Sequence, residues 1–185
     1  MAYAQLLEYP AYELIAGKEV MKVPAGIGHN TVQMNLARPI LNFLHGKRCK
    51  LFTEAMVRLS DTDHFIPDLM IVCDQNKIKE SFIDGAPDFV VEILSPSTKK
   101  YDITVKKEAY EKAGVKEYWI IEPKGRSIEV YILRDGKYIL DNVYSVFNEY
   151  EYEWLTEEQK SEQKMSIKLS LYDGLEIPLL DIFDF

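Results

Sequence analysis

Residues 86–98 read Ala86-Pro87-Asp88-Phe89-Val90-Val91-Glu92-Ile93-Leu94-Ser95-Pro96-Ser97-Thr98. The part from 88 to 94 is almost continuously apolar, which favours a central strand covered on both faces over an edge strand that faces water. Glu92 is the one ionisable residue in its interior. Because a carboxylate in a buried strand must be neutral, paired or bound to a metal, Glu92 is a candidate functional side chain.

A second acid has a similar setting. Pro67-Asp68 heads the apolar run 68–73, which we expect to form a neighbouring strand. Two carboxylates about 4 Å apart repel each other by roughly 4 kcal/mol at an effective dielectric near 20, and a divalent cation between them turns this into attraction. The alternative is that Asp68 caps a turn and Glu92 forms a structural salt bridge. These two residues alone do not decide between the readings.

Magnesium is the ion that this pair favours. Mg²⁺ is typically held by one or two carboxylates, with water and phosphate oxygens completing its shell. The sequence offers no His or Cys cluster for a softer ion. We therefore expect Mg²⁺ as the cofactor, with Mn²⁺ as a substitute.

The rest of the chain alternates helices and strands around this stretch. A hairpin is expected over 12–23, a helix over 30–44 with Asn30 or Thr31 as its cap and a kink at Pro39, and a strand over 55–59. After residue 98 we expect a helix over 102–112 closed by Gly114, strands over 117–121 and 128–133, and a hairpin turn at 135–136. The polar segment 148–164 predicts a surface excursion, with Thr156 as a possible helix cap. The expected class is α/β or α+β, a central mixed sheet flanked by helices.

Length and composition favour one ordinary domain over 1–185, with 47% hydrophobic residues. Cys49 and Cys73 lack the spacing of a zinc knuckle or a redox pair, so reduced thiols in a cytoplasmic protein are expected. Met1–Pro10 has no basic region and no run of eighteen apolar residues occurs, so neither export nor membrane insertion is expected. The net charge of -8 argues against a large nucleic-acid footprint.

The stretch 86–98 resembles the Uma-two family of restriction-endonuclease-like proteins, in the PD-(D/E)XK nuclease superfamily. The resemblance runs from about Tyr9 to Arg134 and again near Gly174. Its other motifs are Tyr12-Glu13-Leu14-Ile15 with Gly17, Pro67-Asp68-Leu69, then Asp102, Lys106 and Tyr110, and Ala113 to Ile121 followed by Pro123. It implies a nuclease fold whose central sheet presents an Asp, a Glu and a Lys to a scissile phosphate.

The lysine does not stand where the superfamily usually has it. In the common pattern it lies two residues after the Glu, and that position is Leu94. Asp102, Lys106 and Tyr110 fall at i, i+4 and i+8 and form one stripe of the next helix, and the resemblance places the migrated lysine at Lys106. The competing interpretation is an ordinary Asp102–Lys106 pair on a solvated face, with Lys107 as the alternative cation.

The expected activity is hydrolysis of DNA phosphodiester bonds. Magnesium on Asp68, Glu92 and the backbone carbonyl of Ile93 would lower the pKa of a bound water, and Lys106 would stabilise the developing charge. The resemblance suggests that Glu13 adds a carboxylate, although it is equally suited to decorate the first hairpin. Residues expected to assist are Lys99, Lys100 and Lys107 for the DNA backbone, Asp102 and Tyr110 as support, and His29 to orient water or phosphate, or else only as a helix-entry residue.

The main alternative is an inactive nuclease fold that acts as a dimeric DNA- or protein-binding scaffold. It is favoured by the acidic charge, by Leu94 in place of lysine, and by the aromatic stretch from Tyr144 to Trp154. A glycosidase is disfavoured because the neighbours of the two acids are aliphatic. We expect a homodimer.

Overall fold

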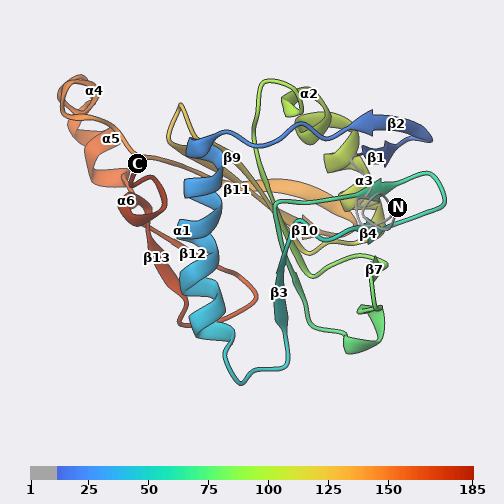
Figure 1. Ribbon diagram of the computed structural model, residues 1–185. Coiled ribbons are helices and arrows are strands. Elements are labelled where there is room, and N and C mark those ends of the chain that lie inside the picture. Colours follow the sequence, from blue (N-terminus) through green and yellow to red (C-terminus); the bar gives the residue numbers. More distant parts are fainter. Residues whose placement is uncertain (1–11) are drawn as a thin grey trace, which may run out of the picture.

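The computed structural model describes residues 12–185. The expectation about Met1–Pro10 lies outside these residues. In chain order (Figure 1) the first half contains β1 Tyr12–Ile15, β2 Lys18–Met21, α1 Ile27–Leu44, β3 Lys50–Thr53, β4 Val57–Arg58, β5 His64–Phe65, β6 Leu69–Val72, the 3-10 turn η1 Gln75–Lys77, β7 Ile83–Asp84 and β8 Phe89–Ile93. The second half contains α2 Lys99–Tyr101, the π-helix η2 Asp102–Lys106, α3 Lys107–Ala113, β9 Glu117–Glu122, β10 Ser127–Arg134, β11 Lys137–Ser145, α4 Glu149–Glu153, α5 Glu157–Glu162, β12 Ser166–Lys168, β13 Glu176–Pro178 and α6 Leu179–Ile182.

The centre is a six-stranded mixed sheet in the order β11-β10-β9-β8-β6-β3. β8 runs parallel to β9 and antiparallel to β6, and the other neighbours pair antiparallel. All five residues of β8 are buried. The prediction of a central strand covered on both faces is confirmed, and the fold class is α+β.

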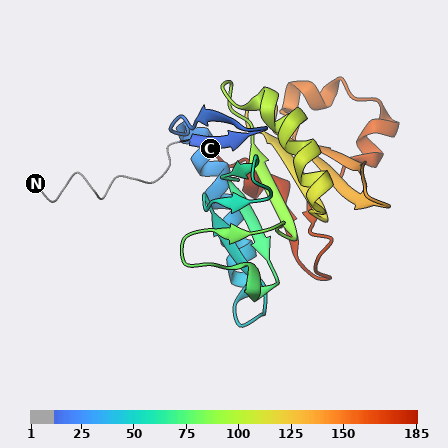
Figure 2. The same ribbon diagram turned by 90° about the vertical axis from the view of Figure 1, so that its right-hand side faces the viewer.

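Alternation along the strands divides the core into two layers. Val91 and Trp119 face the side covered by α1, α6 and the β12–β13 pair, whereas Val90 and Tyr118 face the side covered by α3 and the smaller sheet. Figure 2 shows α1 and α3 on opposite sides of the central sheet. Because side chains alternate with period two, Asp68 and Glu92 fall on the same side as Val90.

A second, five-stranded sheet has the order β2-β1-β5-β4-β7. The hairpin expected over 12–23 is present as β1 and β2. The segment 55–59 contributes only the short strand β4 to this small sheet, and the neighbour of β6 in the large sheet is β3, which the sequence pattern did not indicate. β3 is a half-buried edge strand, so it lacks a long apolar run.

Two helices begin differently from the prediction. α1 starts at Ile27 and its N-cap is Gly26, because the backbone N–H of Asn30 already donates to the carbonyl of Gly26 at 3.0 Å. Asn30 and Thr31 are therefore not caps; Pro39 lies inside the helix as expected. The helix predicted over 102–112 begins earlier, at Lys99 with α2, and runs through the π-helix η2 into α3; Gly114 closes α3 at φ 88° as expected. π-helical turns occur most often at functional sites.

The C-terminal third adds helices to the expected excursion. Asn148 and Thr156 cap α4 and α5, each through a capping box. The tail returns as the β12–β13 pair and α6, which packs near the start of α1. A Cβ added to Gly28 would lie 3.7 Å from the ring of Phe185, so the last residue touches the first turn of α1.

The expectation of reduced thiols is wrong for this structure, in which Cys49 and Cys73 form a disulfide. The register that pairs Lys50 with Val72 places these two cysteines opposite each other at the end of β3 and β6. Their sequence separation of 24 concealed this proximity. Among residues 12–185, none of the helices combines the length and the apolar character needed to cross a membrane.

Candidate active site

Asp68 and Glu92 converge at the ends of two paired strands. Leu69 pairs with Val91, so the next pair outward is Asp68 with Glu92. The backbone N–H of Ile93 donates to Oδ2 of Asp68 at 2.7 Å. The two acids line one cavity of about 230 Å³ together with Ile93, Lys106, His29 and Glu13, and with residues 22–26 and 95–98.

Lys106 lies at the centre of the carboxylates. Its Nζ is 2.9 Å from Oε1 of Glu13, 3.2 Å from Oε1 of Glu92 and 3.1 Å from Oδ1 of Asp102. The side chains of this group are 2–3% exposed. The interpretation of Asp102–Lys106 as a pair on a solvated face is therefore wrong, and Glu13 belongs to the site rather than decorating the hairpin.

Two tyrosine hydroxyls donate hydrogen bonds to residues of this cluster. Tyr110 is fully buried and its Oη donates to Oε1 of Glu92 at 2.9 Å. Tyr118 donates to the backbone carbonyl of Asp102 at 2.9 Å, within η2. A strand residue of β9 thus holds the π-helical turn that carries both Asp102 and Lys106.

Asp68 has its own set of partners from the N-terminal part of the chain. Nε2 of His29 is 3.2 Å from Oδ2 of Asp68, and Nζ of Lys22 is 3.8 Å from Oδ1. The side-chain amide of Gln33 donates to the backbone carbonyl of Asp68 at 2.9 Å. Lys22 and Gln33 were not predicted; the signal for Gln33 was its position one turn after His29, among the apolar residues of α1.

The pKa values of Asp68 and Glu92 are shifted in opposite directions. Burial raises the pKa of Glu92 well above its ordinary value; the charge of Lys106 offsets part of this rise, and the charges of Asp102, Asp68 and Glu13 add to it. Burial also acts to raise the pKa of Asp68, but the hydrogen bond and charge of His29 and the charge of Lys22 lower it overall. Burial opposes the charge of Lys106, yet the surrounding carboxylates raise its pKa well above the usual range. Asp68 is thus the better anion.

The other lysines lie apart from this cluster. Lys99 bonds Glu122 at 2.7 Å, and Nζ of Lys107 lies 3.4 Å from the ring centroid of Tyr131. Lys100 belongs to the short helix α2 and is exposed. Lys107 does not line the cavity, so it does not occupy the place of the alternative cation.

The donor set fits a hard cation on two carboxylates. Within residues 12–185, Oδ1 of Asp68 and Oε2 of Glu92 accept no hydrogen bond, so both have free lone pairs beside the cavity. No group of three His, Cys, Asp or Glu side chains in this part of the chain is arranged to hold a metal. One or two protein carboxylates with water suit Mg²⁺, whereas zinc needs more protein ligands.

Comparisons with known proteins identify the family and the fold of this chain. A family model described as "Putative restriction endonuclease", Uma2, matches residues 2–178. A solved structure of "a putative nuclease belonging to DUF820" from Anabaena variabilis is similar with a TM-score of 0.72 and 20% identity, over 95% of this chain and 90% of that one. The uncharacterized protein slr1290 from Synechocystis is 26% identical over 118 residues, 62% of this chain and 62% of its own length. The fold is that of a nuclease, and the chain belongs to the Uma2 family.

Proposed function

We propose that this protein is a magnesium-dependent endonuclease that hydrolyses phosphodiester bonds of DNA, with Asp68, Glu92 and Lys106 as its catalytic residues. One observation carries the proposal. A lysine that stands far from the usual position in the sequence has its Nζ 3.2 Å from Glu92, in the cavity that Asp68 also lines. A buried ion pair is often no more stabilising than a well-packed apolar pair, which favours a functional reason for this ammonium.

The residues have distinct roles in this proposal. Asp68, Glu92 and the carbonyl of Ile93 would hold Mg²⁺, or Mn²⁺ in its place, and Glu13 would adjust the charge around Lys106. A bound ion would polarise the phosphate and acidify a water molecule. The ammonium of Lys106 stabilises negative charge on the attacked phosphate, while Tyr110 and Asp102 hold Glu92 and Lys106 in place. His29 orients Asp68 through its Nε2.

The test is cleavage of supercoiled plasmid DNA with and without Mg²⁺ or Mn²⁺. Wild type should nick the plasmid only with metal, and Asp68→Asn and Glu92→Gln should each lower the rate by about 10²–10³-fold. Asp84→Asn is a matched control, because this acid on β7 pairs with Arg58 outside the cavity. Metal-independent cleavage, or cleavage that survives both active-site substitutions, would refute the proposal.

A second candidate is a binding protein with a nuclease fold. It is favoured by the cationic side chains around the two acids, since Lys106 contacts Glu92, and His29 and Lys22 lie close to Asp68. Calorimetric titration separates the two. Metal binding that Asp68→Asn abolishes supports the enzyme, whereas DNA binding without metal uptake supports the scaffold.

The proposed assembly is a homodimer. Tyr150 on α4 and Trp154 at its C-cap have exposed side chains that offer apolar area to a second copy. Analytical sedimentation would test the homodimer.

The cytoplasmic location stays a prediction. The Cys49–Cys73 disulfide weighs against the reduced thiols on which that prediction partly depended.

A further inference from the structure

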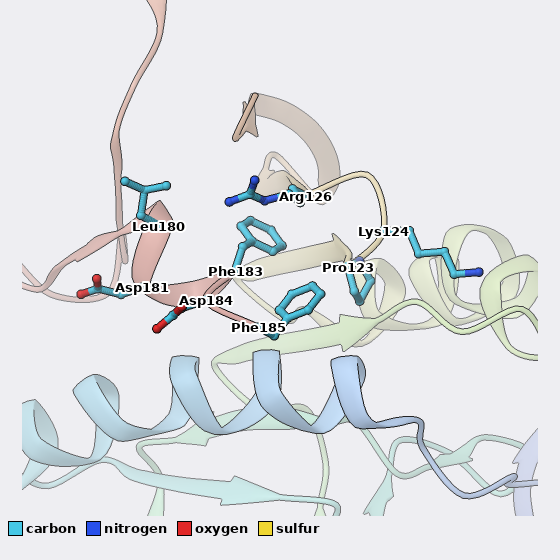
Figure 3. Close-up of a pocket in the computed structure, with 8 residues that line it drawn as sticks. All are labelled: Pro123, Lys124, Arg126, Leu180, Asp181, Phe183, Asp184 and Phe185. Atoms are coloured by element: carbon cyan, nitrogen blue, oxygen red, sulfur yellow. The ribbon is translucent and has the colours of Figure 1, made fainter. Parts of the chain in front are cut away.

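A second cavity lies where the β9–β10 turn meets the C-terminus. It has a volume of about 460 Å³. Figure 3 shows its lining, which is Pro123, Lys124, Arg126, Leu180, Asp181, Phe183, Asp184 and Phe185. None of these residues belongs to the carboxylate site. The volume is of the size that small-ligand sites have.

The backbone of Arg126 has an unusual conformation. Its φ is +46°, in the left-handed region that glycine and asparagine adopt most readily. Gly125 precedes it, so the turn holds a glycine but not at the left-handed position. Strained residues of this kind cluster at functional and ligand-binding sites.

The side chain of Arg126 lacks an acceptor. Its Nε is buried and has no hydrogen-bond partner, and no carboxylate in residues 12–185 lies within ion-pair distance of the guanidinium. Figure 3 shows the carboxylates of Asp181 and Asp184 pointing away from it. A buried donor without an acceptor is costly, so this guanidinium is suited to receive an anion.

Aromatic surface lies next to the guanidinium. Figure 3 shows the ring of Phe183 beside Arg126, and the ring of Phe185 between Phe183 and Pro123. Phe183 is a core residue and only 3% exposed, whereas Phe185 is 63% exposed, so the ring of Phe185 is the one that is open to a ligand. Rings of this kind stack on nucleobases of any sequence, and a guanidinium matches the geometry of a phosphate.

The cavity lies at the same end of the sheet as the carboxylate site. β8 and β9 are parallel with Ile93 opposite Ile121, so their carboxyl ends lie side by side. The ring of Phe185 lies next to Gly28, which is between Gly26 and His29 of the catalytic cavity. The carboxylates lie on the α3 side of the sheet and the second cavity on the α6 side, so a strand that contacts both would pass around the ends of β8 and β9.

We infer that this second cavity binds one nucleotide of the substrate strand, with the phosphate on Arg126 and the base on the exposed ring of Phe185. The inference rests on the proposed nuclease function. It assigns the recognition of a nucleotide near the scissile phosphate to the C-terminal residues. It also explains why an acidic protein needs no broad basic face, because a few directed contacts replace it.

The experiment measures fluorescence anisotropy of a fluorescein-labelled single-stranded 12-nucleotide DNA in EDTA at low salt, so that cleavage does not interfere. Arg126→Asn should weaken binding about tenfold, the loss of one hydrogen-bonded charge contact. Phe185→Ala should weaken it by a similar factor, about tenfold, through lost stacking. Arg134→Asn is the matched control: this exposed arginine pairs with Asp141 on the distant hairpin, and its variant should bind within about twofold of wild type.

Folding is controlled by the choice of substitution. Asparagine tolerates a left-handed φ better than arginine does, so Arg126→Asn should melt at or above the wild-type temperature while losing affinity. Arg126→Lys should retain part of the affinity. Unchanged binding in Arg126→Asn and Phe185→Ala, or no binding by wild type, overturns the inference.

The two proposals fail separately. If plasmid cleavage depends on Asp68 while the Arg126 and Phe185 variants bind as wild type does, only the nucleotide subsite is wrong. If no metal supports cleavage while these variants still lose affinity, the subsite stands and the nuclease proposal falls.

Discussion

The Nζ of Lys106 lies 3.2 Å from Oε1 of Glu92, and both side chains are 3% exposed. The same ammonium contacts Glu13 and Asp102. Removing one partner of a buried charge group leaves the other charges without a counter-charge. This loss of stability is larger than the stability that the ion pair adds over an apolar pair of the same size. The stability of this corner of the molecule and its proposed chemistry therefore depend on one side chain.

Lys106→Ala is expected to remove DNA cleavage by about 10²–10³-fold and to leave metal affinity nearly intact, because Asp68 and Glu92 are unchanged. Plasmid nicking and calorimetric titration with Mn²⁺ measure the two properties. Lys137→Ala, which removes an exposed lysine paired with Glu111, is the control and should cleave normally. Cleavage that survives in Lys106→Ala but vanishes in Lys107→Ala would show that the cation has been assigned to the wrong residue.

Lys106→Met should also destabilise the fold at neutral pH by about 3–5 kcal/mol, since three buried carboxylates lose their counter-charge. Urea denaturation measures the free energy of unfolding. Adding Glu92→Gln to Lys106→Met should recover part of this loss, because it removes one of the uncompensated acids. A double variant less stable than the single one would mean that Glu92 is held mainly by Tyr110.

Tyr110→Phe removes the hydroxyl that donates to Glu92 at 2.9 Å. We expect a loss of about 1.5–3 kcal/mol in unfolding free energy, the range for a hydrogen bond to a charged group. Tyr131→Phe is a matched control, because its hydroxyl bonds Glu129 on a half-buried strand and its loss should cost less. Equal losses in both variants would show that burial of the Glu92 bond adds nothing.

Much of this candidate site could be predicted from the pattern of apolar and charged residues in the sequence. The apolar run around Glu92 and the head position of Asp68 indicated neighbouring strands, and the spacing of Asp102, Lys106 and Tyr110 indicated a stripe. Lys22 was not predictable, because it follows a two-stranded hairpin whose position over Asp68 depends on tertiary packing. The π-helical turn was also invisible, since its register differs from an α-helix only in which carbonyl each N–H reaches.

Which strands pair with each other was the second feature that could not be predicted from the sequence. β3 has a mixed burial pattern, so nothing in Lys50–Thr53 distinguished it from a loop. Without β3 in place, Cys49 and Cys73 looked unrelated, and local spacing then favoured reduced thiols. Long-range register, which only the folded chain supplies, was the missing information.

His29 should make stability depend on pH. Burial opposes its protonation, but the hydrogen bond and charge of Asp68 dominate and raise its pKa above 6.5. A raised folded pKa contributes stability that is complete below the unfolded pKa, near 6.5, and is lost as pH rises through the folded value. Asp68 stays ionised across this window because its own pKa is lowered.

The measurement is the difference in unfolding free energy between wild type and His29→Asn, followed from pH 6 to pH 9 in EDTA. The difference should be of order 1 kcal/mol at pH 6 and should shrink as pH rises. His45→Asn is the control, since this residue ends α1 outside the cavity. A difference that is constant or grows with pH would show that the imidazole is neutral when bound to Asp68.

The Cys49–Cys73 disulfide should stabilise the fold. A bond between Cys49 and Cys73 closes a loop with a sequence separation of 24, and loop closure of this length stabilises a fold by roughly 3 kcal/mol by restricting the unfolded chain. Protein purified without reductant should show no free thiol after denaturation, and a Cys49→Ala, Cys73→Ala variant should unfold at lower urea. Cys73 also donates its backbone N–H to Asp88, which both forms retain, so the difference reports the covalent link rather than the strand pairing. The disulfide would be contradicted if the purified protein had two titratable thiols and the double variant were as stable as wild type. The reduced thiols that the cysteine spacing indicated would then be correct.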